Sequence, residues 1–496
     1  MRVVIRSDAS RVVGTGHVMR CIALAEALQD GGDAVVFAMA ELPPALQRRV
    51  RATGASIERL RTEVGSADDA LLTERLIRRC QADAVVIDGY RLGQGYAARL
   101  RGRSIRLVVD DLGRHGGEAE IILDQNLYAT LARNLNEHST AELLIGPAYA
   151  LLRREFTKPA VRSSEPLDAR RILVSMGGGD PVNATELAVA AIAALRTPQL
   201  EVRVLLGAAR ANPTPVERAA AAHGFQFVRD ATSVADQMAW ADLVVGGCGT
   251  TVLEVARTGR PFVGLILAEN QVAVSRAVSR HGLGVVAGWA TELSGAELAA
   301  AIRDVLEDQA SRTEMAARGP VLVDGLGARR VASVLRTGPL LVRTALSDDA
   351  PILFDWANDP TVRSASFHSE AIGWSEHLAW LNAQLASPDS TLFVCELAGV
   401  PVGLARFVSN GDAATISVLV DATHRARGVG TRLISRATQQ LVVDKRVRSI
   451  DAFVKPDNHQ SIGAFQRAGY LAAVRAPGDE APPGALRFTF SPNAMG

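Results

Sequence analysis

Up to about residue 335, short apolar runs rich in β-branched residues alternate with longer stretches rich in alanine, leucine and arginine. Apolar runs without alternation, separated by helical stretches, are typical of parallel sheets that helices cover on both faces. The runs that we expect to be strands are residues 2–5, 34–40, 84–89, 106–111 and 120–126, followed by 171–179, 201–208, 225–230, 242–247 and 261–267.

Glycine-rich turns follow a strand at two comparable places, "VVGTGH" and "SMGGGD". This repetition predicts two Rossmann-like halves, residues 1–155 and 156–337, joined by the Pro/Ser-containing segment 155–170. Ligands of such sheets bind beyond the carboxyl ends of the strands, so two facing halves would hold a ligand between them. We therefore expect an α/β fold that begins with two doubly wound halves.

The rhythm changes around residues 334–350, and we expect a domain boundary near Gly338-Pro339. The remainder, residues 339–496, has the pattern of a separate α+β domain. After a first strand, the expected elements are helices at 350–359 and 375–386, strands at 391–399, 402–409 and 414–421, and a helix within 425–441.

Composition excludes some classes of protein. With 54 Lys and Arg against 53 Asp and Glu, the net charge of +1 favours neither nucleic acid nor an anionic membrane as a partner. Cys21, Cys80, Cys248 and Cys395 are scattered without metal-ligand spacing, so we expect no metal and a reducing compartment. Neither a membrane-spanning run nor a signal peptide is visible, which predicts a soluble, cytoplasmic protein and leaves its oligomeric state open.

The first glycine turn carries the candidate catalytic residue. Gly14 and Gly16 allow main-chain N–H groups to approach a ligand closely, and the following helix directs its positive end to the same place, which suits a diphosphate. His17 would then stand where the phosphate meets the group attached to it, and a neutral imidazole can take a proton from water there. The alternative is a plain strand-to-helix turn whose histidine only caps the helix.

The second half repeats this arrangement. Gly177 and Gly178 follow a strand, and Asp180 and Pro181 are good residues to start a helix. An ordinary β–α turn is the alternative, although three consecutive glycines exceed what such a turn needs.

The segment "GGCGTTVLEVARTGRP", residues 246–261, carries a further ligand pattern. Gly249 and Thr250 open a helix, and Glu254 lies about one turn into it. A carboxylate there can accept both hydroxyls of a ribose while the helix N-terminus takes the phosphate. Alternatively, Glu254 is the capping-box partner of Thr251, and both roles can hold together.

These pieces resemble nucleotide-sugar enzymes of the GT-B type, and residues 246–261 resemble the lipid-linked N-acetylglucosaminyltransferase of peptidoglycan synthesis. The ordered segments "RSDAS", "GTGHVMRCIALAEAL", "VVDDL", "ILDQN", "YALLRREF", "MGGGD" and "ENQ" are similar, over residues 1–335, to the hydrolase of pseudaminic acid biosynthesis. That family removes UDP from UDP-2,4-diacetamido-2,4,6-trideoxy-β-L-altropyranose. The resemblance makes His17 the catalytic histidine, and it assigns the nucleotide-sugar site to Gly14, Gly16, Glu254, Asn270 and Gln271.

The implied reaction needs groups around the histidine. Water attacks the anomeric carbon while His17 orients or deprotonates it. Asp8, just beyond the first strand, could orient His17 or bind a sugar hydroxyl. Arg20, together with the helix ends, would help UDP to leave.

The third domain has its own loop, Arg425-x-x-Gly428-x-Gly430, between a strand and a helix. Successive main-chain N–H groups in such a loop can wrap a pyrophosphate. The loop and the segments "NHQSIGAFQRAGY" and "WANDPTVRSASFHSEAIGWSEHLAWL" resemble the Gcn5-related N-acetyltransferase superfamily. This implies acetyl-CoA as co-substrate, bound by Val418, Val420, Arg425, Arg427, Gly428, Val429, Gly430, Thr431 and Asn458.

One position departs from that superfamily. Many members carry a tyrosine that protonates the CoA thiolate, and the corresponding position here is Phe465. The general acid of the acetyl transfer is therefore open.

Together the two resemblances predict a bifunctional enzyme of nonulosonic acid biosynthesis. It would N-acetylate the 4-amino group of a UDP-amino sugar and then hydrolyse the product. A glycosyltransferase with an acetylating appendage, or a nucleotide-sugar sensor without catalysis, are the alternatives. The stereochemistry of the sugar, pseudaminic or legionaminic-type, stays open.

Overall fold

The protein was analysed as a computed structural model of residues 1–496. The structure describes residues 1–10, 14–93, 95–100, 102–113, 119–134, 141–158, 169–178, 180, 182–197, 199–207, 213–229, 231–445, 447–474 and 482–492. The greater part of the expected linker, residues 159–168, lies outside the described residues, as do Gly179 and Pro181 of the second glycine turn.

The chain forms two compact units. The first comprises residues 1–111, 124–129 and 145–332, and the second comprises residues 112–123, 130–144 and 333–496. The second unit therefore begins before the expected boundary at Gly338 and includes two segments of the expected first half. The boundaries of the three domains remain predictions.

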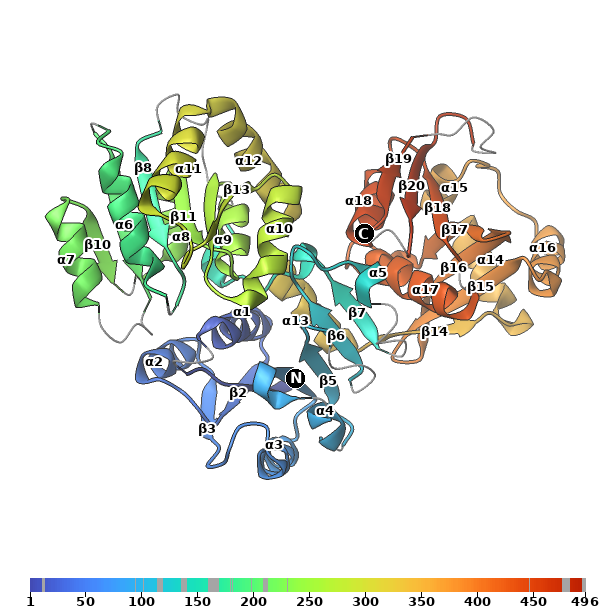
Figure 1. The fold of residues 1–496 in the computed structure, drawn as a ribbon. Coiled ribbons are helices and arrows are strands. Elements are labelled where there is room, and N and C mark those ends of the chain that lie inside the picture. Colours follow the sequence, from blue (N-terminus) through green and yellow to red (C-terminus); the bar gives the residue numbers. More distant parts are fainter. Residues whose placement is uncertain are drawn as a thin grey trace. The chain divides into compact units, whose positions relative to one another are not determined.

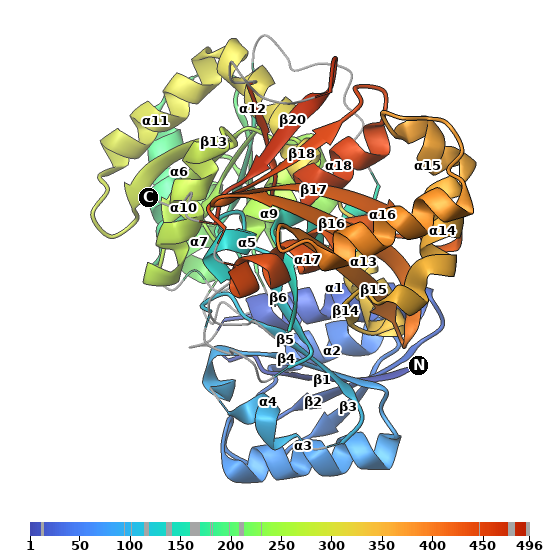
Figure 2. The same ribbon diagram turned by 90° about the vertical axis from the view of Figure 1, so that its right-hand side faces the viewer.

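The first sheet has seven strands in the order β3-β2-β1-β4-β5-β6-β7, and the strand pairs described in it are parallel. Helices α1 and α2 lie on one face and α3 and α4 on the other (Figures 1 and 2). Its strands are β1 (Arg2–Ser7), β2 (Ala34–Met39), β3 (Ser56–Arg59), β4 (Ala84–Asp88), β5 (Ile105–Val109), β6 (Ile121–Asp124) and β7 (Glu142–Ile145). The helices of this region are α1 (Gly16–Asp30), α2 (Pro44–Ala52), α3 (Ala67–Cys80), α4 (Tyr96–Arg99) and α5 (Leu131–Asn134), with 3₁₀ turns at Tyr90–Leu92, Pro147–Tyr149 and Arg154–Phe156.

The second sheet has six parallel strands in the order β10-β9-β8-β11-β12-β13. Alternate residues of one strand enter two different cores: Ile172 and Val174 pack with α6, α7 and α11, whereas Leu173 packs with α8, α9 and α10. Its strands are β8 (Arg171–Ser175), β9 (Glu201–Leu206), β10 (Gln226–Arg229), β11 (Leu243–Gly247), β12 (Phe262–Ile266) and β13 (Gly284–Trp289). Its helices are α6 (Ala184–Ala194), α7 (Thr214–Ala222), α8 (Val234–Trp240), α9 (Thr251–Thr258), α10 (Val272–Arg280), α11 (Gly295–Glu307) and α12 (Gln309–Leu322), with a 3₁₀ turn at Glu269–Gln271. The chain continues into α13 (Gly327–Thr337), whose last residues belong to the second unit.

The third sheet is mixed, with strand order β14-β15-β16-β17-β18-β20-β19, and only β17 and β18 pair in parallel. Helices α14 and α16 lie on one face and α17 and α18 on the other (Figures 1 and 2). The strands are β14 (Leu340–Thr344), β15 (Ser390–Leu397), β16 (Val400–Asn410), β17 (Ala413–Val420), β18 (Ser449–Val454), β19 (Leu471–Ala473) and β20 (Leu486–Phe490). The helices are α14 (Ala350–Asn358), α15 (Pro360–Ala365), α16 (Trp374–Ala386), α17 (Val429–Lys445) and α18 (His459–Arg467), with 3₁₀ turns at Ser347–Asp349 and Ala422–His424.

These sheets confirm the expected fold class, α/β with two Rossmann-like halves followed by an α+β domain. All the strands expected in the first two sheets are present, but three further strands, β3, β7 and β13, were not predicted. β3 is an edge strand with the sequence "SIER", and neither of its ends is buried. Short edge strands bury few side chains and therefore lack a strong apolar pattern.

Strand β7 is the edge strand of the first sheet, and in the second unit it meets helix α17. Glu142 of β7 accepts hydrogen bonds from Arg432 Nε at 2.5 Å and Nη2 at 2.8 Å, and from the main-chain N–H of Leu340 at 2.8 Å. Gln439, also on α17, donates to the carbonyl of Ala141 at 3.3 Å. The side chains of the ion pair are buried, so strand β7 packs directly on this helix.

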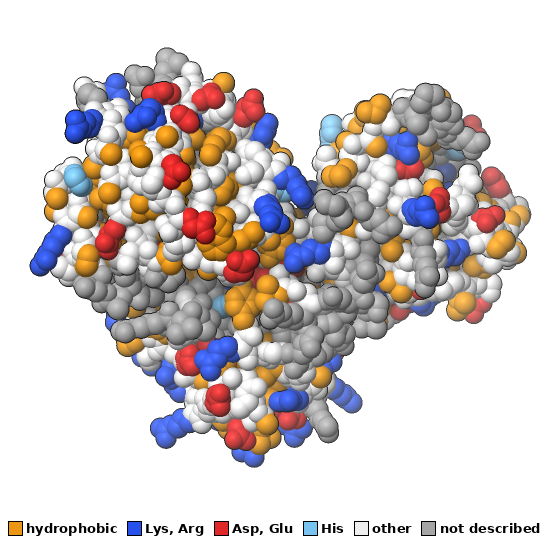
Figure 3. Space-filling view, viewed as in Figure 1, with side chains coloured by type: hydrophobic (Ala, Val, Ile, Leu, Met, Phe, Trp, Pro, Cys, Tyr) orange, Lys and Arg blue, Asp and Glu red, His pale blue; other side chains and the backbone are white. Residues whose placement is uncertain are grey.

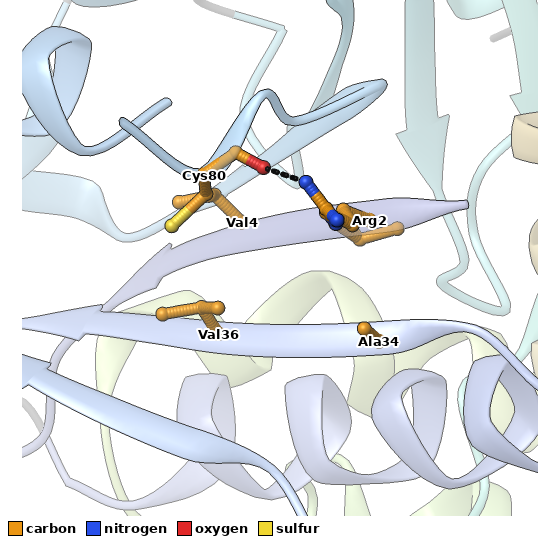
Figure 4. Close-up of a pocket in the computed structure, with 6 residues that line it drawn as sticks. Arg2, Val4, Ala34, Val36 and Cys80 are labelled. Carbon is orange, nitrogen blue, oxygen red and sulfur yellow. Dashed lines mark hydrogen bonds between the residues drawn. The ribbon is translucent and has the colours of Figure 1, made fainter. Parts of the chain in front are cut away.

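A cavity of about 260 Å³ lies at the amino ends of β1 and β2, lined by Arg2, Val3, Val4, Ala34, Val36 and Cys80 (Figure 4). Arg2 donates to the carbonyl of Cys80 at 3.1 Å across it. Because ligands of parallel sheets bind beyond the carboxyl ends of the strands, this cavity is at the wrong edge for the expected site.

On the face shown in Figure 3, the described acidic and basic side chains are interspersed, which agrees with the net charge near zero. None of the helices within the described ranges is both long and apolar enough to cross a membrane.

Candidate active sites

The His17 imidazole is held by Asp88, a carboxylate that the sequence analysis did not assign. His17 is the second residue of α1, and Asp88 ends the neighbouring strand β4. His17 Nδ1 lies 2.6 Å from Asp88 Oδ1, and both side chains are buried. Arg20 Nη2 also lies 3.1 Å from Nδ1, but an ionised carboxylate can only accept, so the shorter contact with Asp88 places the proton on Nδ1. In the neutral ring Nε2 is then the proton acceptor, which is the tautomer that a general base requires.

Asp88 stays ionised because of its neighbours. Arg20 donates to both of its oxygens, from Nε at 2.6 Å and from Nη2 at 2.7 Å. Burial alone would raise the pKa of Asp88, but the charges and hydrogen bonds of Arg20 and His17 outweigh burial and hold it well below its usual range. The carboxylate thus orients the imidazole throughout the physiological pH range.

Arg20 connects this pair to a second carboxylate. Its Nη1 donates to both oxygens of Asp111, at 3.0 and 2.8 Å. Asn126 donates to Asp111 Oδ1 at 2.8 Å, and Tyr90 donates to Oδ2 at 3.2 Å. The motifs "VVDDL" and "ILDQN" therefore meet at Asp111, near the carboxyl ends of their strands. Arg20, which was predicted to help UDP to leave, pairs with the carboxylates of both Asp88 and Asp111.

Asp8 does not contact His17 in this structure. Its Oδ2 accepts from Arg6 at 2.5 Å, and its Oδ1 accepts the main-chain N–H groups of Ala40 and Glu41 at 2.7 and 2.8 Å. The suggestion that Asp8 orients the histidine is therefore wrong, because Asp88 occupies that role. The other suggestion, that Asp8 binds a sugar hydroxyl, stays a prediction.

Tyr90 joins the two halves at the histidine. Its ring meets the His17 ring edge to face at a centroid distance of 4.5 Å. Burial raises the pKa of Tyr90 to about 12, with the charge of Asp111 adding to the effect, while Arg20 and a hydrogen bond with Asn270 oppose it. Asn270 of the second half therefore contacts Tyr90, which in turn contacts the histidine of the first half, within one compact unit.

The glycine turns of the two halves also meet. A Cβ on Gly16 would lie 3.9 Å from Thr250 Oγ1, and one on Gly177 would lie 3.5 Å from Thr251 Oγ1. A Cβ on Gly178 would lie 1.9 Å from Thr15 Oγ1, so a side chain there would require Thr15 to shift. Gly14 and Gly177 both have φ of 82°, a conformation that glycine adopts at low cost.

Helices α1 and α9 both begin at this junction, and neither has a side-chain cap. The first N–H groups of a helix have no partner within it, and the helix dipole favours negative charge there. The arrangement suits an anion such as a diphosphate.

Glu254 is half-buried one turn into α9 and pairs with Arg153, at 2.8 Å from Nη2 to Oε1. Burial raises the pKa of Glu254, and the Arg153 charge opposes the shift. The capping-box alternative with Thr251 is wrong, since α9 has Thr250 at its N-cap and no side-chain capping bond. Arg153 was not identified from the sequence, although it lies in the motif "YALLRREF".

The remaining residues predicted for the nucleotide-sugar site have local partners. Gln271 accepts from the main-chain N–H of Leu267 at 3.0 Å, and its Nε2 would lie 3.5 Å from a Cβ on Gly249. Asp180 accepts from the N–H groups of Ala184 and Thr185, at 2.8 and 3.1 Å, and so stabilises the start of α6. Whether either residue binds a ligand stays a prediction.

In the third domain, strands β17 and β18 diverge beside the expected acetyl-CoA loop. Strands β17 and β18 pair from Ala413 to Ile416, and no pair follows, although β17 continues to Val420. Main-chain groups around Val418 are therefore unpaired on the β18 side. Val420 lies next to Gly430, 3.7 Å from the position of its Cβ. This divergence leaves donors and acceptors available to an extended ligand.

The loop after β17 leads directly into α17. Gly428 has φ of 80° and open space at its Cβ position, so main chain is exposed there. Arg427 is exposed, whereas Val429 and Thr431 are buried in the first turn of α17. Such a loop at a helix start suits a pyrophosphate.

Arg425 braces the loop, because it donates to the carbonyl of Val420 at 3.0 Å and pairs with Asp359 at 2.9 Å. Trp356, on the preceding helix α14, donates to Asp421 at 3.0 Å. Asn458 caps α18 by accepting from the N–H of Ser461 at 3.1 Å. The "WANDP" motif thus fixes the loop, a contact that spacing alone could not predict.

Phe465 is buried and meets Tyr470 edge to face at 5.1 Å between centroids. Tyr470 is also buried and hydrogen bonds to Thr438 at 2.7 Å, and burial raises its pKa well above the usual range. Neither residue supplies an accessible acid. Across the described ranges, no group of three or more His, Cys, Asp or Glu side chains could hold a metal ion.

In comparison with known proteins, two regions of the chain match protein-family models. Residues 172–323 match the sequence model described as glycosyltransferase family 28 C-terminal domain, and residues 351–470 match the acetyltransferase (GNAT) family. The chain thus combines a glycosyltransferase-28-like domain with a GNAT acetyltransferase domain.

Similar whole proteins are distant. An uncharacterised protein of Methanocaldococcus jannaschii is 22% identical over 55% of this chain and 56% of its own length. The spore coat polysaccharide biosynthesis protein SpsG of Bacillus subtilis is 22% identical over 42% of this chain and 62% of its own length. This chain therefore spans less than two thirds of each relative. The crystal structure of MurG from Acinetobacter baumannii is 17% identical, with 68% of this chain and 99% of that chain covered at a TM-score of 0.49.

Proposed function

We propose that this chain is a bifunctional enzyme that acts on one UDP-sugar in two consecutive steps. The GNAT domain N-acetylates the 4-amino group of a UDP-amino sugar with acetyl-CoA. The two Rossmann-like halves then hydrolyse UDP-2,4-diacetamido-2,4,6-trideoxy-β-L-altropyranose to the free sugar and UDP. Because both sites belong to one chain, the local concentration of the intermediate is raised. The pathway is that of pseudaminic or a related nonulosonic acid.

The observation that carries the hydrolytic step is the His17–Asp88 pair. Asp88 accepts from Nδ1 at 2.6 Å, so Nε2 can take a proton from water. The water oxygen forms a bond to the anomeric carbon, the bond from that carbon to the phosphate oxygen breaks, and UDP leaves with the electron pair. The starts of α1 and α9 stabilise the negative charge of the leaving diphosphate.

The acetyl transfer follows from the loop and the open strands. The amine of the sugar attacks the thioester carbonyl, the carbon–sulfur bond breaks, and CoA leaves as a thiolate that takes up a proton. Main-chain groups of β17 and the Arg425–Gly430 loop hold the donor, and buried Phe465 takes no part in the proton transfer.

A glycosyltransferase is the second candidate, because residues 172–323 match a glycosyltransferase family. The two candidates differ only in the acceptor, a sugar hydroxyl or water. A nucleotide-sugar sensor is the third, but a sensor would need no carboxylate that fixes the tautomer of a histidine.

The test is to incubate the full chain with the UDP-4-amino sugar and acetyl-CoA in ¹⁸O-water. The expected products are the acetylated UDP-sugar, and then UDP and free sugar that carries ¹⁸O on its anomeric carbon. Because a free sugar exchanges this oxygen slowly with water, the products are analysed at early times against free sugar incubated alone. Turnover that requires an added sugar acceptor, with no free sugar formed, would establish the glycosyltransferase instead.

A further inference from the structure

Strand β16 carries an arginine that has no counter-charge. Within the described part of the chain, Arg406 forms no ion pair, and its Nε is buried without a hydrogen-bond partner. Burial lowers the pKa of Arg406, and no carboxylate offsets this effect. The ring of the half-buried Trp380 lies beside it, with the centroid 5.8 Å from the guanidinium carbon. A partly buried cation without a counter-charge is costly, and a bound anion would remove that cost.

The strand register places Arg406 beside the expected site of acetyl transfer. Arg406 pairs with Ser417 of β17, and Ser417 is the first residue beyond the last β17–β18 pair, Ile416 with Ala452. Directly paired side chains share one face of a sheet, so Arg406 lies one strand away from the opening between β17 and β18.

This face of the sheet is only partly covered. Leu404, two residues before Arg406 and on the same face, packs in the core beneath α14 and α16. Further across, Thr415 and Ser417 are exposed. Figures 1 and 2 show α14 and α16 on this side and α17 and α18 on the opposite side. A ligand can therefore reach Arg406 from the side opposite to the helix that follows the Arg425–Gly430 loop.

The other charges on this face are satisfied. Asp451 of β18 pairs opposite Thr415 and so shares the face. It accepts from Arg487 at 2.9 Å and from Thr489 at 2.6 Å. Among the described residues Arg406 thus lacks an anionic partner, whereas Arg487 is paired with Asp451.

We propose that Arg406 binds the diphosphate of the acetyl acceptor, and so selects a nucleotide-linked amino sugar over a free amino sugar. This inference rests on the proposed function for the identity of the acceptor. Arginine suits the task because its planar guanidinium donates to two phosphate oxygens at once. Trp380 alongside limits water at the guanidinium and strengthens the interaction.

The first experiment measures acetylation by the full chain of the UDP-4-amino sugar and of the same amino sugar without UDP. In Arg406→Gln, the ratio of the two kcat/KM values should fall by about 10- to 100-fold, the range for hydrogen bonds to a charged group. The KM for acetyl-CoA should stay unchanged, and Arg406→Lys should recover part of the ratio. Arg448→Gln is the matched control, because it removes an exposed cation of the same domain that is paired with Asp412. An unchanged ratio in Arg406→Gln overturns the inference.

The second experiment does not depend on the acetyl acceptor. UDP is titrated calorimetrically into the full chain saturated with CoA, so that the donor site is filled. Arg406→Gln should bind one UDP fewer than the wild type. If the wild type fails to acetylate the UDP-amino sugar but Arg406→Gln still loses a UDP site, the proposed acetylation is wrong and the Arg406 site stands. Equal stoichiometry and affinity for UDP in the wild type and in Arg406→Gln would show that Arg406 forms no UDP site.

Discussion

The centre around His17 and the loop around Gly428 differ in the chemical groups that they present. Around His17, Asp88, Arg20 and Asp111 form a buried network of charged side chains, each with partners at 2.6–3.0 Å. Around Gly428 the open main chain is the proposed binding surface, and the side chain of Arg425 braces the loop. The first centre should therefore be sensitive to a change of charge, and the second to added bulk.

The strongest test of this difference is Gly428→Val. A side chain at φ of 80° is strained, and its bulk occupies the space in which a pyrophosphate must approach the main chain. We expect acetylation to be abolished and UDP release from pre-acetylated substrate to be retained, when both are assayed in the full chain. Arg427→Ala, which changes an exposed side chain of the same loop, is the control and should reduce acetylation only modestly. Simultaneous loss of both activities in Gly428→Val would show that the two sites are not independent.

His17→Ala should lower UDP release by about 10²-fold or more, the range for loss of a general base. UDP binding should be nearly unchanged, because the helix ends that we propose for the diphosphate remain. Turnover and the dissociation constant of UDP are measured on the same protein. Wild-type turnover would remove His17 from the mechanism.

Asp88→Asn tests the charge network through stability. Removing one charge of a buried pair costs about 3–5 kcal/mol in free energy of unfolding, and the cost here should lie at the lower end, because Arg20 loses one of its two counter-charges and keeps Asp111. The folded-state pKa of Asp88 is depressed, so its contribution is fully present above its unfolded value of about 4 and is lost as the pH falls through the folded value. Denaturant unfolding at pH 7 and at pH 3 should show a larger difference from the wild type at pH 7. An equal difference at both pH values would contradict the ionised pair.

Glu254→Ala should weaken UDP binding by about 1–3 kcal/mol, if the carboxylate accepts from the ribose as proposed. In the structure Glu254 is paired with Arg153, so the variant also releases that cation. Arg153→Ala is the matched control, and calorimetry with UDP separates the two. An unchanged dissociation constant in Glu254→Ala would leave the carboxylate with only its partnership to Arg153.

The smallest effect is expected for Asn458→Ala. Its side chain caps α18, and loss of such a cap costs about 1 kcal/mol in free energy of unfolding. Because the cap is local, acetylation should fall only as far as α18 loosens, and Asn458→Ser should restore the stability. A large rise in the KM for acetyl-CoA without loss of stability would instead make Asn458 a direct ligand.

The sequence predicts those parts of the fold that carry a strong apolar signal. The buried strands β1, β4, β8 and β11 were expected, and a candidate site residue lies at or just beyond the carboxyl end of each. The edge strand β3 was missed, because its short polar sequence contains little of the periodic pattern that identifies a strand.

The candidate site residues likewise divide into those that the sequence predicts and those that it does not. His17 and the glycine turns can be found from local spacing, since the turn and the helix start are neighbours in sequence. Asp88 could not be paired with His17 in this way, because 71 residues separate them and only the β1–β4 register brings them together. Asp8 was chosen because it is near in sequence, whereas the correct carboxylate is near in space.

The contact between β7 and α17 has a consequence for gene fission and for expressing parts of the chain. An uncovered edge strand offers unpaired main-chain groups to other molecules and promotes aggregation. Helix α17 shields this edge, through Arg432 with Glu142 and Gln439 with Ala141. A gene cut at Gly338 would release a first fragment with a bare edge, so such fragments should self-associate unless a surrogate covers them.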